Sequence, residues 1–156
     1  MANPTLPAAL LLLLFCSVCP MAVWADQQRI ERCILSAAQY RHQDPKLLKA
    51  IALQESGMNP SLVSGRNKNG TVDIGLFQIN SSWLPKLKKQ GITERQLYDG
   101  CVSAYVAAWI LAHEIDTHGL TWRAVGAYNS PTEANRKIYA QRIQQRYMAL
   151  QSDKER

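Results

Sequence analysis

One glutamate lies on a helix face that is otherwise apolar. Counting back three, four and seven positions from Glu55 reaches an apolar residue each time, and a helix would turn all of them to one side; they are Ala52, Ile51 and Leu48. Burial penalises the charged form of a carboxyl group, and the negative end of the helix dipole adds to this, so both would raise the pKa of Glu55. A carboxyl group that keeps its proton near neutral pH can act as a general acid. The alternative is that Glu55 turns outward at the helix end and pairs with a lysine or arginine.

A second acidic residue, Asp73, follows the longest irregular stretch of the sequence. Residues 57–70 are polar and rich in Gly, Asn, Ser and Pro, and such loops within compact domains are often functional. Glycosidases commonly place two acidic side chains beside the bond they cleave, one as the acid and the other as nucleophile, base or charge stabiliser. Glu55 and Asp73 are candidates for such a pair. Taken alone, Asp73 is explained more simply as a turn or cap residue.

The elements that must carry these two acids are mostly helices. The chain has 156 residues, of which 47% are hydrophobic and 19% charged, enough for one domain with a buried core. Asp44-Pro45 and Gly57 mark the start and the stop of the helix that contains Glu55. The expected helices cover 28–41, 45–56, a short segment after Gly75, a segment opened by Thr93, 101–117, 121–128 and 131–150, and residues 71–74 can form a short strand. The sequence predicts a mainly α, single-core domain with at most a small β-hairpin, in which 101–117 is the most buried helix.

The first 25 residues differ in character from the rest of the chain. They contain no charged side chain, include an apolar run from Leu6 to Val23, and place small residues before Asp26 at the spacing of a cleavage site. Residues 1–25 are therefore interpreted as a secretory signal peptide and residues 26–156 as the mature domain. The alternative is an uncleaved membrane anchor.

The role of the cysteines depends on this division. Cys16 and Cys19 lie in the predicted signal peptide, which leaves Cys33 and Cys101 in the mature domain. An even number of cysteines in an oxidising compartment is typical of disulfide bonding, so we expect one bond between these two residues.

The net charge of +6 indicates which partners suit the mature domain. Basic residues at 86, 88 and 89, and again at 136, 137, 142 and 146, predict a surface that attracts acidic groups; the alternative is a face that only promotes solubility. A nucleic-acid partner is not expected for an exported protein. The three histidines at 42, 113 and 118 are too scattered for a metal-ligand set, and we expect no metal or cofactor and a monomeric chain.

Four short motifs resemble one known family. They are Gln54-Glu55-Ser56, Gly75-Leu76-Phe77-Gln78-Ile79-Asn80, Ala127-Tyr128-Asn129 and Ile138-Tyr139, and they match in order the motifs of the goose-lysozyme-like (SLT-domain) lytic transglycosylases. The resemblance covers about residues 29–147 and implies a lysozyme-like fold. The small size, the cysteine pair and the segment 71–75 look most like the specialised subgroup associated with type III and type IV secretion systems and conjugative pili. Such a protein would act in the periplasm on peptidoglycan glycan strands.

The resemblance also implies roles for individual residues. Glu55 would protonate the glycosidic oxygen between N-acetylmuramic acid and N-acetylglucosamine, and would then serve as base while the muramyl 6-hydroxyl closes on C1 to give a 1,6-anhydro product. Ser56 is expected to form a hydrogen bond near Glu55 and orient it, and Tyr139 to reach Glu55 from behind. Three further residues are expected to line the cleft and contact the substrate or the acid: Gln78, Tyr128 and Asn129.

Two features depart from the pattern or add to it. Ser130-Pro131 follows Tyr-Asn where the family often has Ala-Gly, which is expected to reshape the cleft wall. An aspartate after the catalytic glutamate also resembles the arrangement of animal-type lysozymes, so Asp73 could stabilise an oxocarbenium-like transition state or permit hydrolysis. The alternatives to a transglycosylase are thus a hydrolytic muramidase using Glu55 and Asp73, and a non-catalytic glycan-binding assembly protein.

Overall fold

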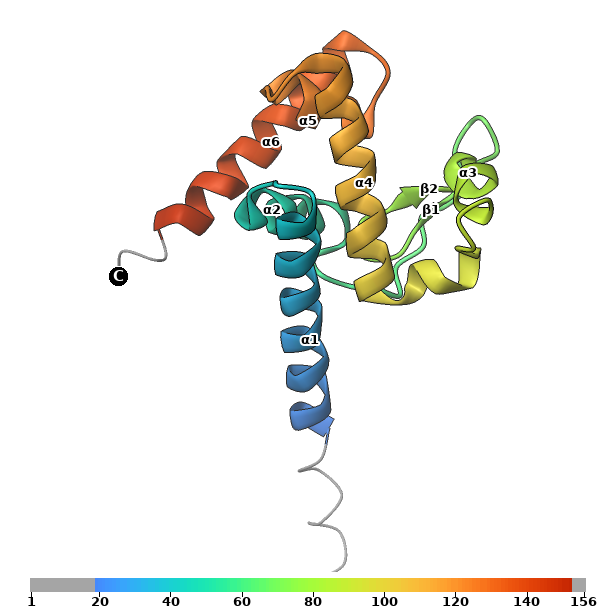
Figure 1. Cartoon of the computed structure of the whole chain (residues 1–156), viewed down its shortest axis with the longest axis vertical. Coiled ribbons are helices and arrows are strands. Elements are labelled where there is room, and N and C mark those ends of the chain that lie inside the picture. Colours follow the sequence, from blue (N-terminus) through green and yellow to red (C-terminus); the bar gives the residue numbers. More distant parts are fainter. Residues whose placement is uncertain (1–18, 153–156) are drawn as a thin grey trace, which may run out of the picture.

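Helices dominate the architecture of the protein, whose computed structural model describes residues 19–152 (Figure 1). The elements, in order, are α1 (Cys19–Tyr40), α2 (Pro45–Ser56), β1 (Asp73–Ile74), β2 (Ile79–Asn80), the 3-10 turn η2 (Ser81–Trp83), α3 (Leu84–Lys88), the 3-10 turn η3 (Glu94–Tyr98), α4 (Gly100–His118), α5 (Trp122–Asn129) and α6 (Glu133–Ser152). The prediction of a mainly α domain with a small hairpin is confirmed. Most of the predicted signal peptide lies outside the described residues, and α1 begins within its last part. None of the helices in residues 19–152 has the length and apolar character needed to cross a membrane.

The core is built around α4, which runs through the middle of the molecule in Figure 1. It packs against α1 and α5, while α6 packs against both α5 and α2. Eight of its residues are buried, compared with four in α2 and three in α6. The prediction that residues 101–117 form the most buried helix is confirmed. The close approach of α5 and α6 depends on Gly126, where a Cβ would lie 2.5 Å from the carbonyl oxygen of Arg136.

The helix that carries Glu55 begins and ends as its sequence predicts. Asp44 accepts a hydrogen bond from the backbone N–H of Lys46 at 2.8 Å and caps the N-terminus, with Pro45 in the first turn. Gly57 ends the helix in the left-handed region, with φ of 61°. Glu55 therefore lies in the last turn of α2, where the chain leaves the helix for the irregular loop.

The short helix predicted after Gly75 is α3, but a hairpin turn and the strand β2 come before it. β1 pairs antiparallel with β2 in the register Asp73–Asn80 and Ile74–Ile79, and the four residues between them form the hairpin turn. Gly75 and Gln78 both have positive φ, 75° and 47°, which a right-handed helix does not allow. The apolar residues Leu76 and Phe77 are fully buried and bring the turn down onto the core. The next α-helix along the chain is α3.

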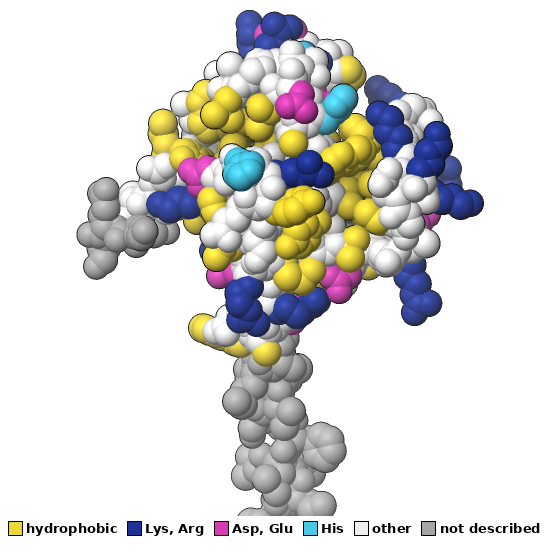
Figure 2. All heavy atoms as spheres, viewed as in Figure 1, with side chains coloured by type: hydrophobic (Ala, Val, Ile, Leu, Met, Phe, Trp, Pro, Cys, Tyr) yellow, Lys and Arg dark blue, Asp and Glu magenta, His cyan; other side chains and the backbone are white. Residues whose placement is uncertain are grey.

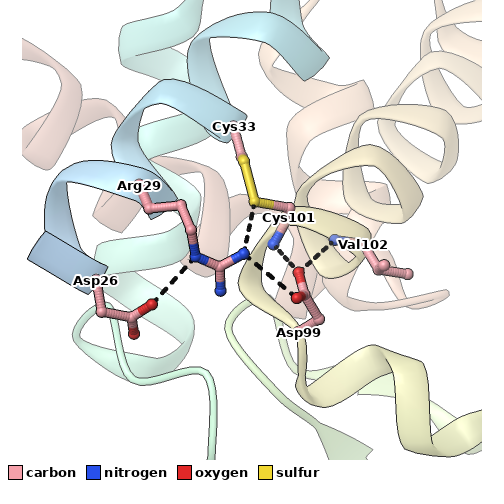
Figure 3. The surroundings of a disulfide bond; sticks show 6 residues. All are labelled: Asp26, Arg29, Cys33, Asp99, Cys101 and Val102. Atoms are coloured by element: carbon pink, nitrogen blue, oxygen red, sulfur yellow. Dashed lines mark hydrogen bonds and ion pairs between the residues drawn. A yellow bond between two sulfur atoms is a disulfide. The ribbon is translucent and has the colours of Figure 1, made fainter.

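A disulfide bond joins α1 to the start of α4, as predicted for Cys33 and Cys101 (Figure 3). Asp99 caps α4 by accepting from the backbone N–H of Cys101 at 2.7 Å, and Arg29 on α1 contacts the Asp99 carboxylate at 3.3 Å. The bond closes a loop with a sequence separation of 68 residues, and a loop of that length corresponds to about 4 kcal/mol of stabilisation in the chain-entropy model. The position of α1 against α4 is therefore fixed covalently as well as by packing.

Candidate active site

A cleft of about 640 Å³ lies between the end of α2, the hairpin, α4 and the α5–α6 connection. It brings together five of the seven side chains that the sequence predicted for a site: Glu55, Asp73, Gln78, Tyr128 and Asn129. Ser56 and Tyr139, the other two, are not among the residues that line it. Residues from separate elements thus converge on one concave surface, as expected for a binding site.

Glu55 is a mostly buried acid whose carboxyl group faces this cleft. Burial raises its pKa from 4.5 to about 7, a hydrogen bond from Tyr139 lowers it in part, and the nearby charge of Asp73 raises it further. The outward-facing alternative is wrong, because no lysine or arginine among the described residues forms an ion pair with Glu55. At neutral pH the group is therefore divided between its acid and its base form.

Tyr139 reaches Glu55 from α6 and does not line the cleft itself. Its hydroxyl donates a hydrogen bond to Oε1 of Glu55, and its side chain is only 6% exposed. Burial raises the pKa of Tyr139 well above its usual range, and the negative charge on Glu55 acts in the same direction. The phenol therefore stays protonated and remains a donor to the carboxylate whenever Glu55 is ionised.

Asp73 is held in place by three neutral donors. Its Oδ1 accepts from the side-chain amide of Asn80 at 2.7 Å, and its Oδ2 accepts from the amide of Asn67 at 3.0 Å and the hydroxyl of Ser64 at 3.3 Å. These donors come from β2 and from the irregular loop before β1, so the loop is used to orient the carboxylate. The second acid faces the same cleft as Glu55 in a fixed geometry.

The hairpin turn that carries Gln78 is fixed by hydroxyl groups from three helices. Ser56 on α2 donates to the carbonyl oxygen of Leu76 at 2.7 Å, and Tyr128 on α5 donates to that of Phe77 at 3.1 Å. The buried hydroxyl of Ser103 on α4 accepts from the backbone N–H of Phe77 at 3.4 Å.

This corrects the expected role of Ser56. Its hydroxyl binds the hairpin backbone and accepts from the N–H of Asn59 at 3.0 Å, so it positions the turn rather than the Glu55 carboxylate. Tyr128 lines the cleft as expected, while its hydroxyl is already engaged by the turn.

Gln78 lies at the end of the turn, with its amide group held against the chain. Its Nε2 donates to the carbonyl oxygens of Gly75 at 2.9 Å and Leu62 at 3.1 Å. The donors of the amide are therefore used within the protein, and its carbonyl oxygen is the group left for a ligand in the cleft.

Several residues of the cleft were not predicted as site residues. Asn80 is part of one of the four motifs and Asn67 belongs to the irregular loop, so the sequence offered a reason to predict both as site residues. It offered none for Trp83 and Glu114, which reach the cleft from η2 and α4. Oε2 of Glu114 lies 3.7 Å from Nε2 of His118. Arg136 also lines the cleft and donates to the carbonyl oxygen of Ser130 at 2.9 Å, in the segment where Ser130-Pro131 departs from the pattern.

Comparison with known proteins decides the family. Residues 32–149 match the family described as "Transglycosylase SLT domain", which is most of the chain. The chain belongs to this SLT transglycosylase family. The match contains all four motifs that carried the resemblance, and membership makes the protein a peptidoglycan lytic transglycosylase.

Curated relatives of this SLT transglycosylase come from enteric bacteria. It is 43% identical over 132 residues to the invasion protein IagB of Salmonella typhi, covering 81% of this chain and 78% of the relative. It is 39% identical over 112 residues to protein IpgF of Shigella flexneri, covering 69% and 73%. A peptidoglycan-binding-like protein of Escherichia coli O157:H7 is 37% identical over 111 residues, covering 64% and 66%.

The raised pKa of Glu55 makes a prediction about stability. Between pH 4.5 and about 7 the folded state binds more protons than the unfolded state, so this group makes the protein less stable as the pH rises. Glu55→Gln removes the titration. We expect the variant to exceed the wild type in free energy of unfolding by about 3 kcal/mol at pH 8, and the difference to vanish below about pH 4.5.

Urea unfolding of both proteins across this pH range measures the difference. Glu94→Gln, at an exposed glutamate of η3, is the matched control and should show no such pH-dependent gain. A gain for Glu55→Gln that is equal at pH 4 and pH 8 would contradict the buried-acid assignment.

Proposed function

We propose that this transglycosylase cleaves the β-1,4 bond between N-acetylmuramic acid and N-acetylglucosamine with Glu55 as its general acid and base. The observation that carries the proposal is a mostly buried carboxyl group, with a pKa of about 7, on the wall of an open cleft. Such a group holds a proton for part of the time at neutral pH and can accept one for the rest.

In the first step, the proton of Glu55 passes to the glycosidic oxygen as the bond to muramyl C1 breaks. The leaving sugar departs with a hydroxyl group, C1 acquires oxocarbenium character, and Glu55 becomes a carboxylate. The hydrogen bond from Tyr139 supports this newly charged form, because hydrogen bonds to an ionised group are stronger than those to a neutral one.

In the second step, the same carboxylate takes the proton from the muramyl 6-hydroxyl while the oxygen of that hydroxyl bonds to C1. The product is a 1,6-anhydromuramyl end, no water is consumed, and Glu55 regains its proton for the next cycle. Only one acid changes its protonation state in these two steps, and the environment of Glu55 suits it to act as both acid and base.

Asp73 is proposed to stabilise positive charge at C1 between the two steps. Its carboxylate is oriented by three donors, lies on the cleft wall and is close enough to raise the pKa of Glu55. The same geometry supports a second candidate, hydrolysis by a muramidase mechanism in which water rather than the 6-hydroxyl attacks C1.

The muropeptides released from purified peptidoglycan test the reaction. We expect anhydromuramyl ends in the mass spectrum, and a rate for Glu55→Gln that is lower by about 10²- to 10⁴-fold, the usual contribution of a general acid. Glu94→Gln serves again as the control and should keep wild-type activity. Reducing muramic acid ends would favour the muramidase, while equal activity of wild type and Glu55→Gln would favour a non-catalytic glycan-binding protein.

Asp73→Asn tests the role of the second acid. Loss of a charge that faces the transition state should lower the rate by about 10- to 100-fold. Because the Asp73 charge raises the pKa of Glu55, the variant should also lose activity at a lower pH than the wild type does. A pH–rate profile measures both effects. A shift in the profile without a change in the maximal rate would limit Asp73 to raising the pKa of Glu55.

The relatives suggest a setting for this activity. One is named an invasion protein and another a peptidoglycan-binding-like protein, and both match most of this chain. We propose that the protein is exported to the periplasm by the signal peptide at residues 1–25 and opens the wall locally for a secretion or pilus apparatus. The basic residues of the surface would attract the acidic peptide stems of peptidoglycan.

Export makes a prediction about the mature protein. Its intact mass, measured without reduction after periplasmic expression, should correspond to a chain that begins at Asp26 and lacks two thiol hydrogens. Reduction should restore those two hydrogens. A full-length mass would instead support an uncleaved anchor, and two free thiols would contradict the bond between Cys33 and Cys101.

A further inference from the structure

A second large cavity lies apart from the catalytic residues. It is a groove of about 690 Å³ between the end of α1, the α3–η3 segment and α4. Its floor is apolar and includes Leu87, Val106 and Trp109, while Tyr40 and Tyr105 stand at its edge with 69% and 43% of their surface exposed. In Figure 2, hydrophobic side chains gather in the hollow between the middle of the molecule and the lobe on the right. Exposed aromatic rings beside an apolar concavity are typical of an interaction surface.

The groove is separate from the cleft, and one aromatic contact divides them. Trp109 lines the groove, Trp83 lines the cleft, and their rings meet edge to face with centroids 5.3 Å apart. None of Glu55, Asp73 and Gln78 belongs to the groove. An occupant of the groove would therefore leave the cleft open to a glycan strand.

The charges beside the groove are mainly positive, and Glu94 on η3 is an acidic exception. Arg41 is the only charged side chain among the described residues that line it, and Lys86, Lys88 and Lys89 flank Leu87 on and next to α3. Within residues 19–152 none of these four cations forms an ion pair with a carboxylate. Two of them lie over aromatic rings instead, Arg41 over Tyr40 at 5.4 Å and Lys86 over Trp83 at 4.9 Å. Positive charge beside the groove thus exceeds negative charge.

The groove is also held in shape before anything binds. Cys101, one of its lining residues, is joined to Cys33 on α1. Gln96, another, accepts from the backbone N–H of Thr93 at 2.8 Å and closes the capping box of η3. A preformed groove lowers the entropic cost of binding a partner.

We propose that this groove docks an amphipathic helix of a partner protein, with the apolar face of the helix in the groove and acidic side chains toward Arg41 and the lysines of α3. A helix presents apolar residues at positions i, i+3, i+4 and i+7, which suits a long apolar concavity. The unpaired cations select acidic flanks rather than basic ones.

Other occupants fit these observations less well. A second copy of this chain would bring its own positive rim and a net charge of +6 to the interface. A glycan strand would need many polar groups, and the lining offers fewer of them than the cleft does: two amides, two tyrosine hydroxyls and one indole N–H, from Gln90, Gln96, Tyr40, Tyr105 and Trp109. The groove is therefore distinct in ligand chemistry from the cleft, whose lining is rich in carboxyl, amide and hydroxyl groups.

A display library of 18-residue helical peptides tests the proposal on the intact mature protein. Each peptide carries randomised apolar residues at i, i+3, i+4 and i+7, and either Glu or Lys on the flanks. We expect enrichment of the Glu-flanked peptides. The dissociation constant of an enriched peptide, measured by fluorescence anisotropy, should rise at least tenfold in Arg41→Glu and in Tyr105→Glu. Arg142→Glu, an equal charge reversal on an exposed position of α6, should leave it unchanged.

Three results would overturn the proposal. The first is a failure to enrich the Glu-flanked peptides, whether the Lys-flanked peptides are enriched instead or neither class is. The second is that Tyr105→Glu still binds the enriched peptide as tightly as the wild type does. The third is a concentration-dependent dimer in sedimentation analysis that Tyr105→Glu abolishes, which would assign the groove to a second copy. Circular dichroism and thermal melting of each variant establish that it is folded, so the result does not depend on whether the proposed glycan cleavage is correct.

Discussion

The contact on which the site depends is the hydrogen bond from Tyr139 to Glu55 in the last turn of α2. Burial alone would hold Glu55 as a neutral acid, and a free carboxylate in water would hold no proton at neutral pH. The phenol, brought to Glu55 by the packing of α6 against α2, opposes the effect of burial and leaves the pKa at about 7. The long helix α6 thus helps to set the pKa of Glu55, although it contributes little to the wall of the cleft.

The hairpin depends on the helices for its position, because two short strands cannot hold a fixed position by themselves. Hydroxyl groups from α2, α4 and α5 bind the backbone of its turn, and the apolar residues of the turn enter the core. The helical bundle therefore sets the place of the hairpin, and the hairpin sets the place of Asp73. In this way two acids that belong to different elements come to share one cleft.

The sequence predicted best those features that depend on local geometry. Helical spacing placed Glu55 on the apolar face of its helix but left the outward-facing alternative open, whereas the limits of α2 followed from Asp44, Pro45 and Gly57. The place of the hairpin turn between Gly75 and Gln78 was not predicted, since its apolar residues suit either a turn or a helix and the positive φ of Gln78 carries no sequence signal. Tertiary packing determines the contacts of Ser56 and brings Trp83 and Glu114 to the cleft, and spacing along the chain does not reveal such packing.

The covalent link between α1 and α4 has a consequence for when the protein becomes rigid. Thiols in a reducing cytosol stay unpaired, so the precursor of the proposed export route would hold these two helices together by noncovalent packing alone. Both the apolar groove and the cleft have α4 as a wall. On the proposed export route, the chain would be easier to unfold before translocation, and its fold would reach full stability only after the disulfide bond forms.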